Sequence, residues 1–274
     1  MPKVDALRGR SGFTQAIGTT LSILGFGLLV ALVVGGVQSG RFTFPGGDVT
    51  NFLTAGARLR DGQPPYVGSW DGVGTVYFAP PWIVVFGAAG LLPSWVLTGA
   101  LIALDVVGLR YLTGSWRAFG WASLCPLTAF QLISGNPNFA VVAAILAAAR
   151  GRQDLLVWAA LAKLGPAIAV DVRRWRPVLI SLLVAVALTL PWPGLWLDWI
   201  RFLISATPNP GWPVIVPLIL RIPFIVLLLA TRRRELQALA AALAIPGFYI
   251  VTAWATIILI LRLLGMARSG RLGR

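Results

Sequence analysis

The sequence contains no histidine and a single cysteine, Cys125. The lack of histidine excludes His-ligated metals and histidine acid–base catalysis, and one cysteine excludes both a disulfide framework and a cysteine-based metal cluster. Charged residues are also scarce: they make up 12% of the chain, against about 25% in soluble domains. Because hydrophobic residues reach 57%, the composition excludes an ordinary water-soluble enzyme.

Acidic residues are the rarest charged class, with 9 Asp and Glu against 23 Lys and Arg and a net charge of +14. The arginines fall in clusters between long apolar runs rather than on one basic face. Cytoplasmic loops of membrane proteins collect Lys and Arg in this way. We therefore interpret the positive charge as loop charge of a multi-pass membrane protein and predict no nucleic-acid partner.

The apolar runs indicate an all-α polytopic membrane protein of about eight to nine membrane helices, since a spanning helix needs about 20 apolar residues. The first run, 13–37, follows the basic N-terminal segment 1–12, which predicts an uncleaved first span, a cytoplasmic N-terminus and an outer loop over 38–75. A basic tail over 265–274 completes a single membrane domain, 1–274, in the cell (plasma) membrane. The other runs are 76–92, 94–113, 116–134, 137–150, 154–171, 177–191, 213–231 and 236–264.

The middle of the chain leaves the topology open. The runs 116–134 and 137–150 flank Gly135-Asn136-Pro137-Asn138, and a 14-residue helix reaches only about 21 Å of a core about 30 Å thick. These segments are therefore expected to be tilted, broken or re-entrant. The arginine clusters at 150–152 and 173–176 both resemble cytoplasmic loops, so either one cluster lies outside or the run 154–171 does not cross fully.

The outer loop contains a short amphipathic helix over 48–62 that is expected to lie in the interface plane. Its polar side carries Thr50, Asn51, Thr54, Arg58 and Asp61, and its apolar side carries Val49, Phe52, Leu53 and Leu59. Asp48, at its start, has two compatible interpretations: a helix N-cap, or a carboxylate held at the membrane surface by the positive helix end.

Aromatic residues border the rest of this loop. Trp70 and Trp82 are predicted to be interfacial anchors. Tyr66 and Tyr77 flank the turn-rich centre of the loop, so they could equally line a pocket.

Two basic residues lie inside apolar runs, where an ionisable group indicates a functional site unless it snorkels to the headgroups. Lys163 is one of only two lysines. Arg221 precedes Pro223, and a buried guanidinium needs an anion such as phosphate. Asp105 is an acidic residue at similar depth and is expected to pair with an arginine.

Several motifs, in this order, resemble the polyprenyl-phosphate-sugar-dependent glycosyltransferases of family 87, mannosyltransferase-like enzymes with the GT-C fold. The motifs are an Asp after the first span with a helix ending in Gly-x-x-x-Tyr (Asp48, Gly62, Tyr66), Tyr-x-x-Pro-Pro (Tyr77 to Pro81), Gly135-Asn136-Pro137-Asn138, Lys-x-x-Pro (Lys163 to Pro166), and Asn209 followed by Arg221. Asn136 replaces the usual Gln of that family, and the Ser that usually follows the Asn is absent. The chain is also short for the family, so C-terminal spans are expected to be missing.

The resemblance implies an inverting transfer of a sugar, plausibly mannose, from a polyprenyl-phosphate donor to a lipid or glycan acceptor at the outer face of the membrane. Asp48 would be the general base, Lys163 and Arg221 would bind the donor phosphate, and no metal or other cofactor is implied. The substrate pocket would include Asn51, Tyr66, Tyr77, Asn136, Asn138 and Asn209. Two other functions remain open: a small transporter or lipid flippase, because broken helices and isolated charges also occur in carriers, and an inactive GT-C-like membrane scaffold.

Overall fold

The structure is a computed structural model that describes residues 19–20, 23–25, 27–28, 31, 34, 38, 47–67, 76–205, 214–231 and 233–268. The predicted first span, most of the basic tail, Trp70 and the proposed pocket residue Asn209 lie wholly or largely outside this set. Within it the chain is all-helical and contains no strand. The elements are α2 (Gly47–Arg60), α3 (Pro80–Ala89), α4 (Ser94–Thr113), α5 (Trp116–Ser123), α6 (Pro126–Ser134), α7 (Asn138–Ala149), α8 (Gln153–Lys163), the 3-10 helices η1 (Gly165–Ala169) and η2 (Val172–Arg174), α9 (Trp175–Thr189), α10 (Leu195–Ser205), α11 (Leu218–Ala230), α12 (Arg234–Leu243) and α13 (Ile250–Arg268).

Among the described helices, two are long and apolar enough to cross a membrane: α4 and, within α13, Ile250–Ala267. The helices α6 and α7 form a third candidate only if they count as one broken span, because their axes are bent by 99° at the break. The apolar helices α3, α9 and α11 are shorter, at 10–17 residues. The described part of the chain therefore has two or three candidate spans, not the eight to nine expected from the apolar runs.

Proline and glycine divide two of the long runs that the sequence analysis treated as single segments. The run 116–134 separates into α5 and α6 where Pro126 occupies the first turn of α6, because proline has no amide hydrogen for a continuing helix. The run 236–264 separates into α12 and α13 around Pro246 and Gly247. Of the predicted apolar runs, only 94–113 coincides from end to end with a single described helix, α4.

The helix predicted over 48–62 is present as α2, and it packs on α3. Val49, Phe52 and Leu59 are buried, as expected for its apolar side. The rings of Phe52 and Phe86 stack with centroids 4.6 Å apart. A Cβ on Gly56 would lie 2.5 Å from the backbone nitrogen of Gly87, so the two helices approach each other backbone to backbone.

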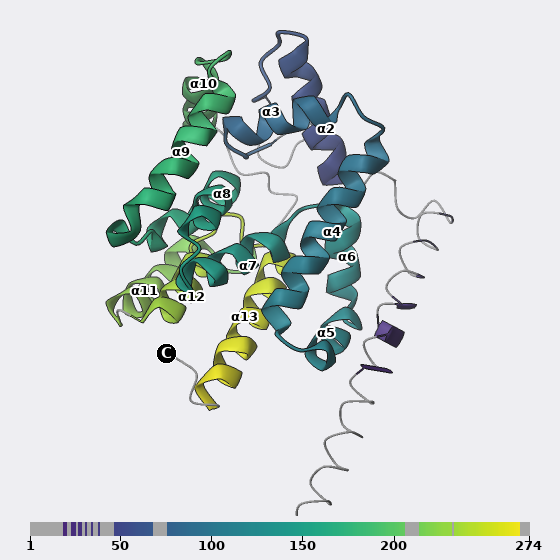
Figure 1. The fold of residues 1–274 in the computed structure, drawn as a ribbon, viewed down its shortest axis with the longest axis vertical. Helices are drawn as coiled ribbons and strands as arrows, with labels where there is room; N and C mark the ends of the chain where they lie inside the picture. Colours follow the sequence, from purple (N-terminus) through teal and green to yellow (C-terminus); the bar gives the residue numbers. More distant parts are fainter. Residues whose placement is uncertain are drawn as a thin grey trace, which may run out of the picture.

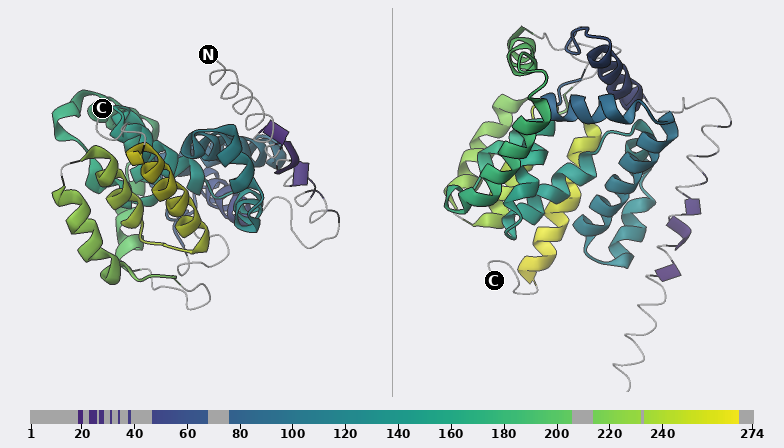
Figure 2. Two further views of the ribbon diagram at one scale, coloured as in Figure 1. Left: turned by 90° about the horizontal axis from the view of Figure 1, so that it is seen from below. Right: turned by 45° about the horizontal axis from the view of Figure 1, so that its top comes forward.

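The described helices form a bundle with two different ends (Figure 1). The helices α2, α3 and α10 gather at one end, which we call the aromatic end and define by Tyr66, Tyr77, Trp199 and Phe202. At the other end lie α5 and the C-terminal part of α13 (Figure 1). This second end, which we call the basic end, is defined by Arg110 in the last turn of α4, Arg150, which contacts Met266 of α13, and Arg262, which lies against Gly114. Figure 2 shows α13 passing between the α4–α6 helices and the α11–α12 helices.

Candidate functional site

Two short helices form an antiparallel hairpin in the centre of the bundle. The helices α7 and α8 pack on each other and are joined through Gly151, whose φ of +114° permits the tight turn. Because both are 11 or 12 residues long, the start of α7 and the end of α8 lie at the same level. Each covers about 16–18 Å at 1.5 Å per residue, or about half of a membrane core about 30 Å thick.

The segment from Gln153 to Asp171 returns to the level at which it began. The backbone amide of Asp171 donates a hydrogen bond to the Gln153 side-chain oxygen over 3.1 Å. Arg174 also lies against this turn: a Cβ added to Gly151 would lie 2.5 Å from a guanidinium nitrogen of Arg174. The arginine clusters at 150–152 and 173–176 therefore lie at one end of the bundle, which is the arrangement expected if the run 154–171 does not cross the membrane.

Lys163 is the last residue of α8 and lies where the chain turns from α8 into η1. The next residue, Leu164, has φ +57° and is the only non-glycine residue with positive φ among those described. A branched aliphatic residue in this conformation is strained, and such strain is concentrated at functional sites. The Lys163 ammonium lies 5.8 Å from the centroid of the Phe78 ring.

Asp105 organises a buried polar network beside Lys163. Its Oδ1 accepts a hydrogen bond from the backbone amide of Ala140 in the first turn of α7, over 2.9 Å. Its Oδ2 accepts one from the Gln131 side-chain amide, over 2.8 Å. Asp105 was expected to pair with an arginine; the structure instead gives it the first turn of α7 and the Gln131 side-chain amide.

The network continues across the broken helix to α13. The Asn138 amide donates to the Gln131 side-chain oxygen over 2.9 Å, and the Thr252 hydroxyl donates to the Asn138 oxygen over 3.3 Å. Gln131 also donates to the backbone oxygen of Asn136. All of these side chains except Asn136 are almost fully buried. The Asn136 side-chain oxygen is buried without a hydrogen-bond partner, which makes it the one open acceptor of the group.

The first turn of α2 reaches the same break between α6 and α7. Val49 lies so close to Gly135 that a Cβ added to Gly135 would collide with the Val49 side chain. Asp48 therefore occupies the part of α2 that lies nearest the 135–138 loop. Phe52, one helical turn further on, contacts Phe78 with ring centroids 5.0 Å apart, and Phe78 in turn lies beside Lys163. Asp48 lies inside the first turn of α2, where a carboxylate stabilises the positive helix end.

Tyr66 and Tyr77 belong to an aromatic cluster at the aromatic end. The Tyr66 hydroxyl donates to the backbone oxygen of Phe78 over 3.0 Å, and both tyrosine rings lie against Phe202 of α10. The Trp199 indole donates to the Tyr77 backbone oxygen over 2.9 Å. Burial, and then the negative charge of Asp198, raise the pKa of Tyr66 well above its usual range. Tyr66 is therefore a neutral hydrogen-bond donor that fixes the loop to the segment preceding α3.

Trp82, predicted to be an interfacial anchor, is half-buried and its indole donates to the Trp158 backbone oxygen over 3.3 Å. This contact joins α3 to α8. Asn51, on the other hand, lies on α2 and is partly buried.

Arg221 lies elsewhere and has a different kind of partner. It is 3% exposed, and its guanidinium donates to the backbone oxygens of Val216 at 2.9 Å, Ile245 at 2.9 Å and Pro246 at 3.4 Å, as well as Leu243. Its remaining face lies 4.5 Å from the Phe248 ring centroid. The anion anticipated for this guanidinium is thus replaced by the carbonyl end of α12. These contacts favour a structural role and do not support the predicted binding of a donor phosphate by Arg221.

Gln131 and Thr252 were not predicted as site residues from the sequence, and Asp105 was expected only to pair with an arginine. A polar residue within an apolar run was the available signal for all three. Among the described residues, no three Cys, Asp or Glu side chains lie together as a metal site would require. The amide at the start of α7 and the Gln131 side-chain amide already bond Asp105, so Lys163 is the group of this arrangement that suits an anionic oxygen ligand.

Comparison with known proteins found no matching family model, no similar curated protein and no similar solved structure.

Proposed function

We propose that the chain is a membrane glycosyltransferase that moves a sugar, plausibly mannose, from a polyprenyl-phosphate donor to a lipid or glycan acceptor. One observation supports the proposal: α8, which ends at Lys163, packs on α7, and the first turn of α2, which contains Asp48, contacts the break before α7. A cation for the leaving phosphate and a carboxylate base are the groups that transfer from a phosphate ester requires.

In this mechanism the acceptor hydroxyl oxygen attacks the anomeric carbon of the donor sugar. Asp48 takes the hydroxyl proton, and the bond between the anomeric carbon and the phosphate oxygen breaks on the opposite face. The bonding electron pair leaves with the polyprenyl phosphate, and the sugar configuration inverts, as expected for a single displacement through an oxocarbenium-like transition state. Lys163 stabilises the charge that develops on the leaving phosphate.

The pocket residues of this proposal are Asn51, Tyr66, Tyr77, Asn136 and Asn138. Tyr66 and Tyr77 support the fold of the aromatic end, while Asn136 supplies the open acceptor that a sugar hydroxyl requires. Asn138 is already bonded to Gln131 and Thr252, so its contribution is to hold the break in place. Donor phosphate binding is assigned to Lys163 alone.

We also propose a multi-pass arrangement in the cell membrane, in which the shorter helices α3, α9 and α11 complete the bundle around α4, α13 and the broken pair. The clustered arginines of the basic end would face the cytoplasm. The aromatic end, with α2 lying in the interface, would face outward. This orientation agrees with a cytoplasmic N-terminus and puts Asp48 on the outer side.

The test uses the full chain in liposomes with radiolabelled polyprenyl-phosphate mannose and a lipid extract of the host membrane as acceptor. Asp48→Asn retains the size and polarity of the side chain but removes the base, so transfer should fall about 10²–10⁴-fold. Asp61→Asn is the matched control, because Asp61 is an exposed carboxylate at the other end of α2, and it should transfer at the wild-type rate. An unaltered rate in Asp48→Asn would eliminate Asp48 as the base.

A carrier remains the second candidate because of one feature, the 99° break between α6 and α7 with its buried polar network. Discontinuous helices of this kind form substrate sites in transporters. Movement of a fluorescent lipid across the liposome membrane, without any sugar transfer, would favour the carrier over the glycosyltransferase.

A further inference from the structure

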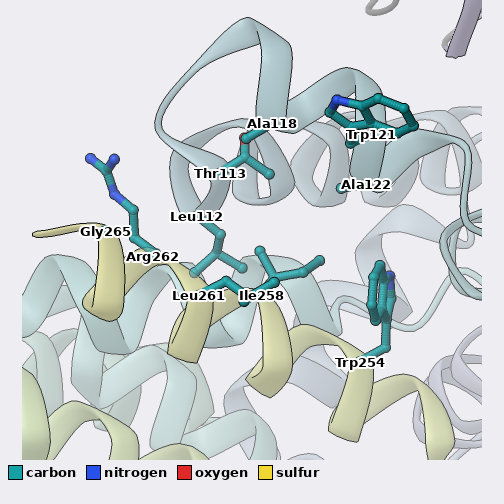
Figure 3. Close-up of a pocket in the computed structure, with 10 residues that line it drawn as sticks. All are labelled: Leu112, Thr113, Ala118, Trp121, Ala122, Trp254, Ile258, Leu261, Arg262 and Gly265. Carbon is teal, nitrogen blue, oxygen red and sulfur yellow. The ribbon is translucent and has the colours of Figure 1, made fainter. Parts of the chain in front are cut away.

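A groove separate from the proposed site runs between α13 and the α4–α5 corner. It has a volume of about 360 Å³ and is lined almost entirely by apolar groups. Figure 3 shows Trp254, Ile258 and Leu261 along one wall of the groove and Trp121 and Leu112 opposite. Trp254 is fixed by a hydrogen bond from its indole to the Thr128 hydroxyl, 2.9 Å long.

The length of the groove matches one leaflet of a bilayer. It follows α13 from Trp254 to Gly265, which is about 16 Å at 1.5 Å per residue. Half of a hydrocarbon core is about 15 Å. Trp254 lies in the first turns of α13, level with the Thr252 contact to Asn138 in the polar network, so the groove extends from the middle of the bundle to the basic end.

The charge at the groove is positive. Arg262 is the charged residue that lines it, and the adjoining turn from Arg110 to Arg117 contains two arginines and no acidic residue. Arg262 itself lines the groove and lies against Gly114, at the C-terminal end of α4. An apolar channel that opens at an arginine-rich rim matches an amphiphile with an acyl chain and an anionic headgroup. Basic pockets between helices on the cytoplasmic side bind anionic lipids in this way.

We propose that this groove binds one acyl chain of an anionic glycerophospholipid from the leaflet at the basic end, with the headgroup phosphate at Arg262. The apolar wall alone would accept any lipid, and the arginine rim supplies the preference for negative charge. This proposal does not depend on the glycosyltransferase activity. The donor phosphate of that reaction would lie at Lys163, at the inner tip of α8.

Two glycines provide a matched pair of variants. Gly265 lines the groove, and a Cβ there meets no atom within 4 Å, so Gly265→Leu fills the groove without disturbing the helix. Gly99 in α4 is equally open but lies outside the groove. Gly99→Leu therefore adds the same side chain to a helix surface without affecting the proposed binding site.

The experiment is native mass spectrometry of the delipidated full-length protein titrated with 1-palmitoyl-2-oleoyl phosphatidylglycerol or the corresponding phosphatidylcholine. The wild-type protein and Gly99→Leu should retain one phosphatidylglycerol more tightly than phosphatidylcholine, and Gly265→Leu should lose this high-affinity adduct. Arg262→Gln keeps the groove open but removes the charge, so phosphatidylglycerol should bind roughly fivefold more weakly and the lipid preference should disappear.

Two results would overturn the proposal. Equal phosphatidylglycerol binding by Gly265→Leu and the wild-type protein would show that the groove is not the binding site. Equal binding of the two lipids by the wild-type protein would show that the arginine rim does not select an anionic headgroup. If Gly265→Leu does not fold, the Arg262→Gln titration decides the outcome by itself.

Discussion

Gln153 and Asp171 close a loop of the chain: the side-chain oxygen of Gln153 accepts a 3.1 Å hydrogen bond from the backbone amide of Asp171. The carboxylate of Asp171 also forms an ion pair with Arg234 of α12, with a nitrogen–oxygen distance of 3.3 Å. The mostly apolar segment between these two residues therefore begins and ends at the same end of the bundle. Lys163, at the end of α8, lies at the far tip of this loop and is partly buried.

The hairpin makes a direct prediction about topology. The test uses a Cys125→Ser background with a single cysteine at an exposed position, either Arg152→Cys or Arg173→Cys. Both cysteines should be protected from an impermeant thiol reagent in intact cells. Both should react once the membrane is permeabilised. Asp61→Cys, at the exposed end of α2, should react in intact cells and is the control for access from outside. Labelling of position 152 and position 173 from opposite sides would mean that the run 154–171 crosses the membrane.

The sequence anticipated the parts of the fold that depend on local pattern. The helix α4 follows from an uninterrupted apolar run, and α2 follows from polar and apolar residues at helical spacing. The prediction that Lys163 belongs to a functional site rests on the rarity of an ionisable residue in such a run, and it stays a prediction. The number of spans was overestimated, because the length of an apolar run does not show where a helix bends within it.

The contacts that joined distant segments could not be predicted in the same way. Asp105 receives its hydrogen bonds from Gln131 and Ala140, which are 26 and 35 residues away in the chain. Arg221 was expected to bind phosphate, but its partners are carbonyls at the end of α12, more than 20 residues later. A buried guanidinium predicts an electronegative partner, whereas only the packing decides whether that partner is a ligand or the backbone.

A second prediction concerns the close approach of α2 and α3. Gly56→Ala places a methyl group 2.5 Å from the Gly87 nitrogen, so the helices must separate. The free energy of unfolding should fall by about 1–3 kcal/mol, as is typical of overpacked sites. Gly47→Ala, in the same helix but with no atom within 4 Å of its Cβ, should leave the melting temperature in detergent unchanged or slightly raised. Equal melting temperatures for the two variants would refute the close packing.

A third prediction follows from the buried hydroxyl of Tyr66. Burial, reinforced by the charge of Asp198, raises the pKa of Tyr66 in the folded protein, so ionisation is easier in the unfolded chain. This contribution to stability is complete below the ordinary tyrosine pKa near 10 and is lost as the pH rises above it. Above pH 10 the free energy of unfolding should decrease by about 1.4 kcal/mol per pH unit from this group alone.

Tyr66→Phe is the control for this effect. It removes the hydroxyl and its hydrogen bond to Phe78, so the variant should be less stable at neutral pH but should lack the Tyr66 part of the alkaline dependence. The measurement is chemical unfolding of both proteins between pH 8 and pH 11.5. Parallel curves for the two proteins would show that the Tyr66 hydroxyl is not buried as described.

The last prediction distinguishes the buried Arg221 from the partly buried Lys163. Arg221→Met removes the donor from carbonyls of Val216, Leu243 and Ile245, and each buried acceptor left without a partner costs about 1–3 kcal/mol. Arg221→Met should therefore lower the melting temperature strongly. Arg221→Lys should recover little of this loss, because a single ammonium cannot reach carbonyls spread along the end of α12.

Lys163→Met should give the opposite pattern. Methionine keeps much of the apolar stem, and the Asp105 carboxylate keeps both of its hydrogen bonds, so the fold should be largely retained. Sugar transfer, however, should fall about 10²–10³-fold if the ammonium stabilises the departing phosphate, and Lys163→Arg should restore part of it. Both melting temperature and turnover must be measured for every variant, because loss of fold also abolishes turnover. Normal melting of Arg221→Met with loss of transfer would assign the donor phosphate to Arg221. Normal turnover of Lys163→Met would make Lys163 a structural residue. The proposed glycosyltransferase would then lack the cation that its leaving group requires.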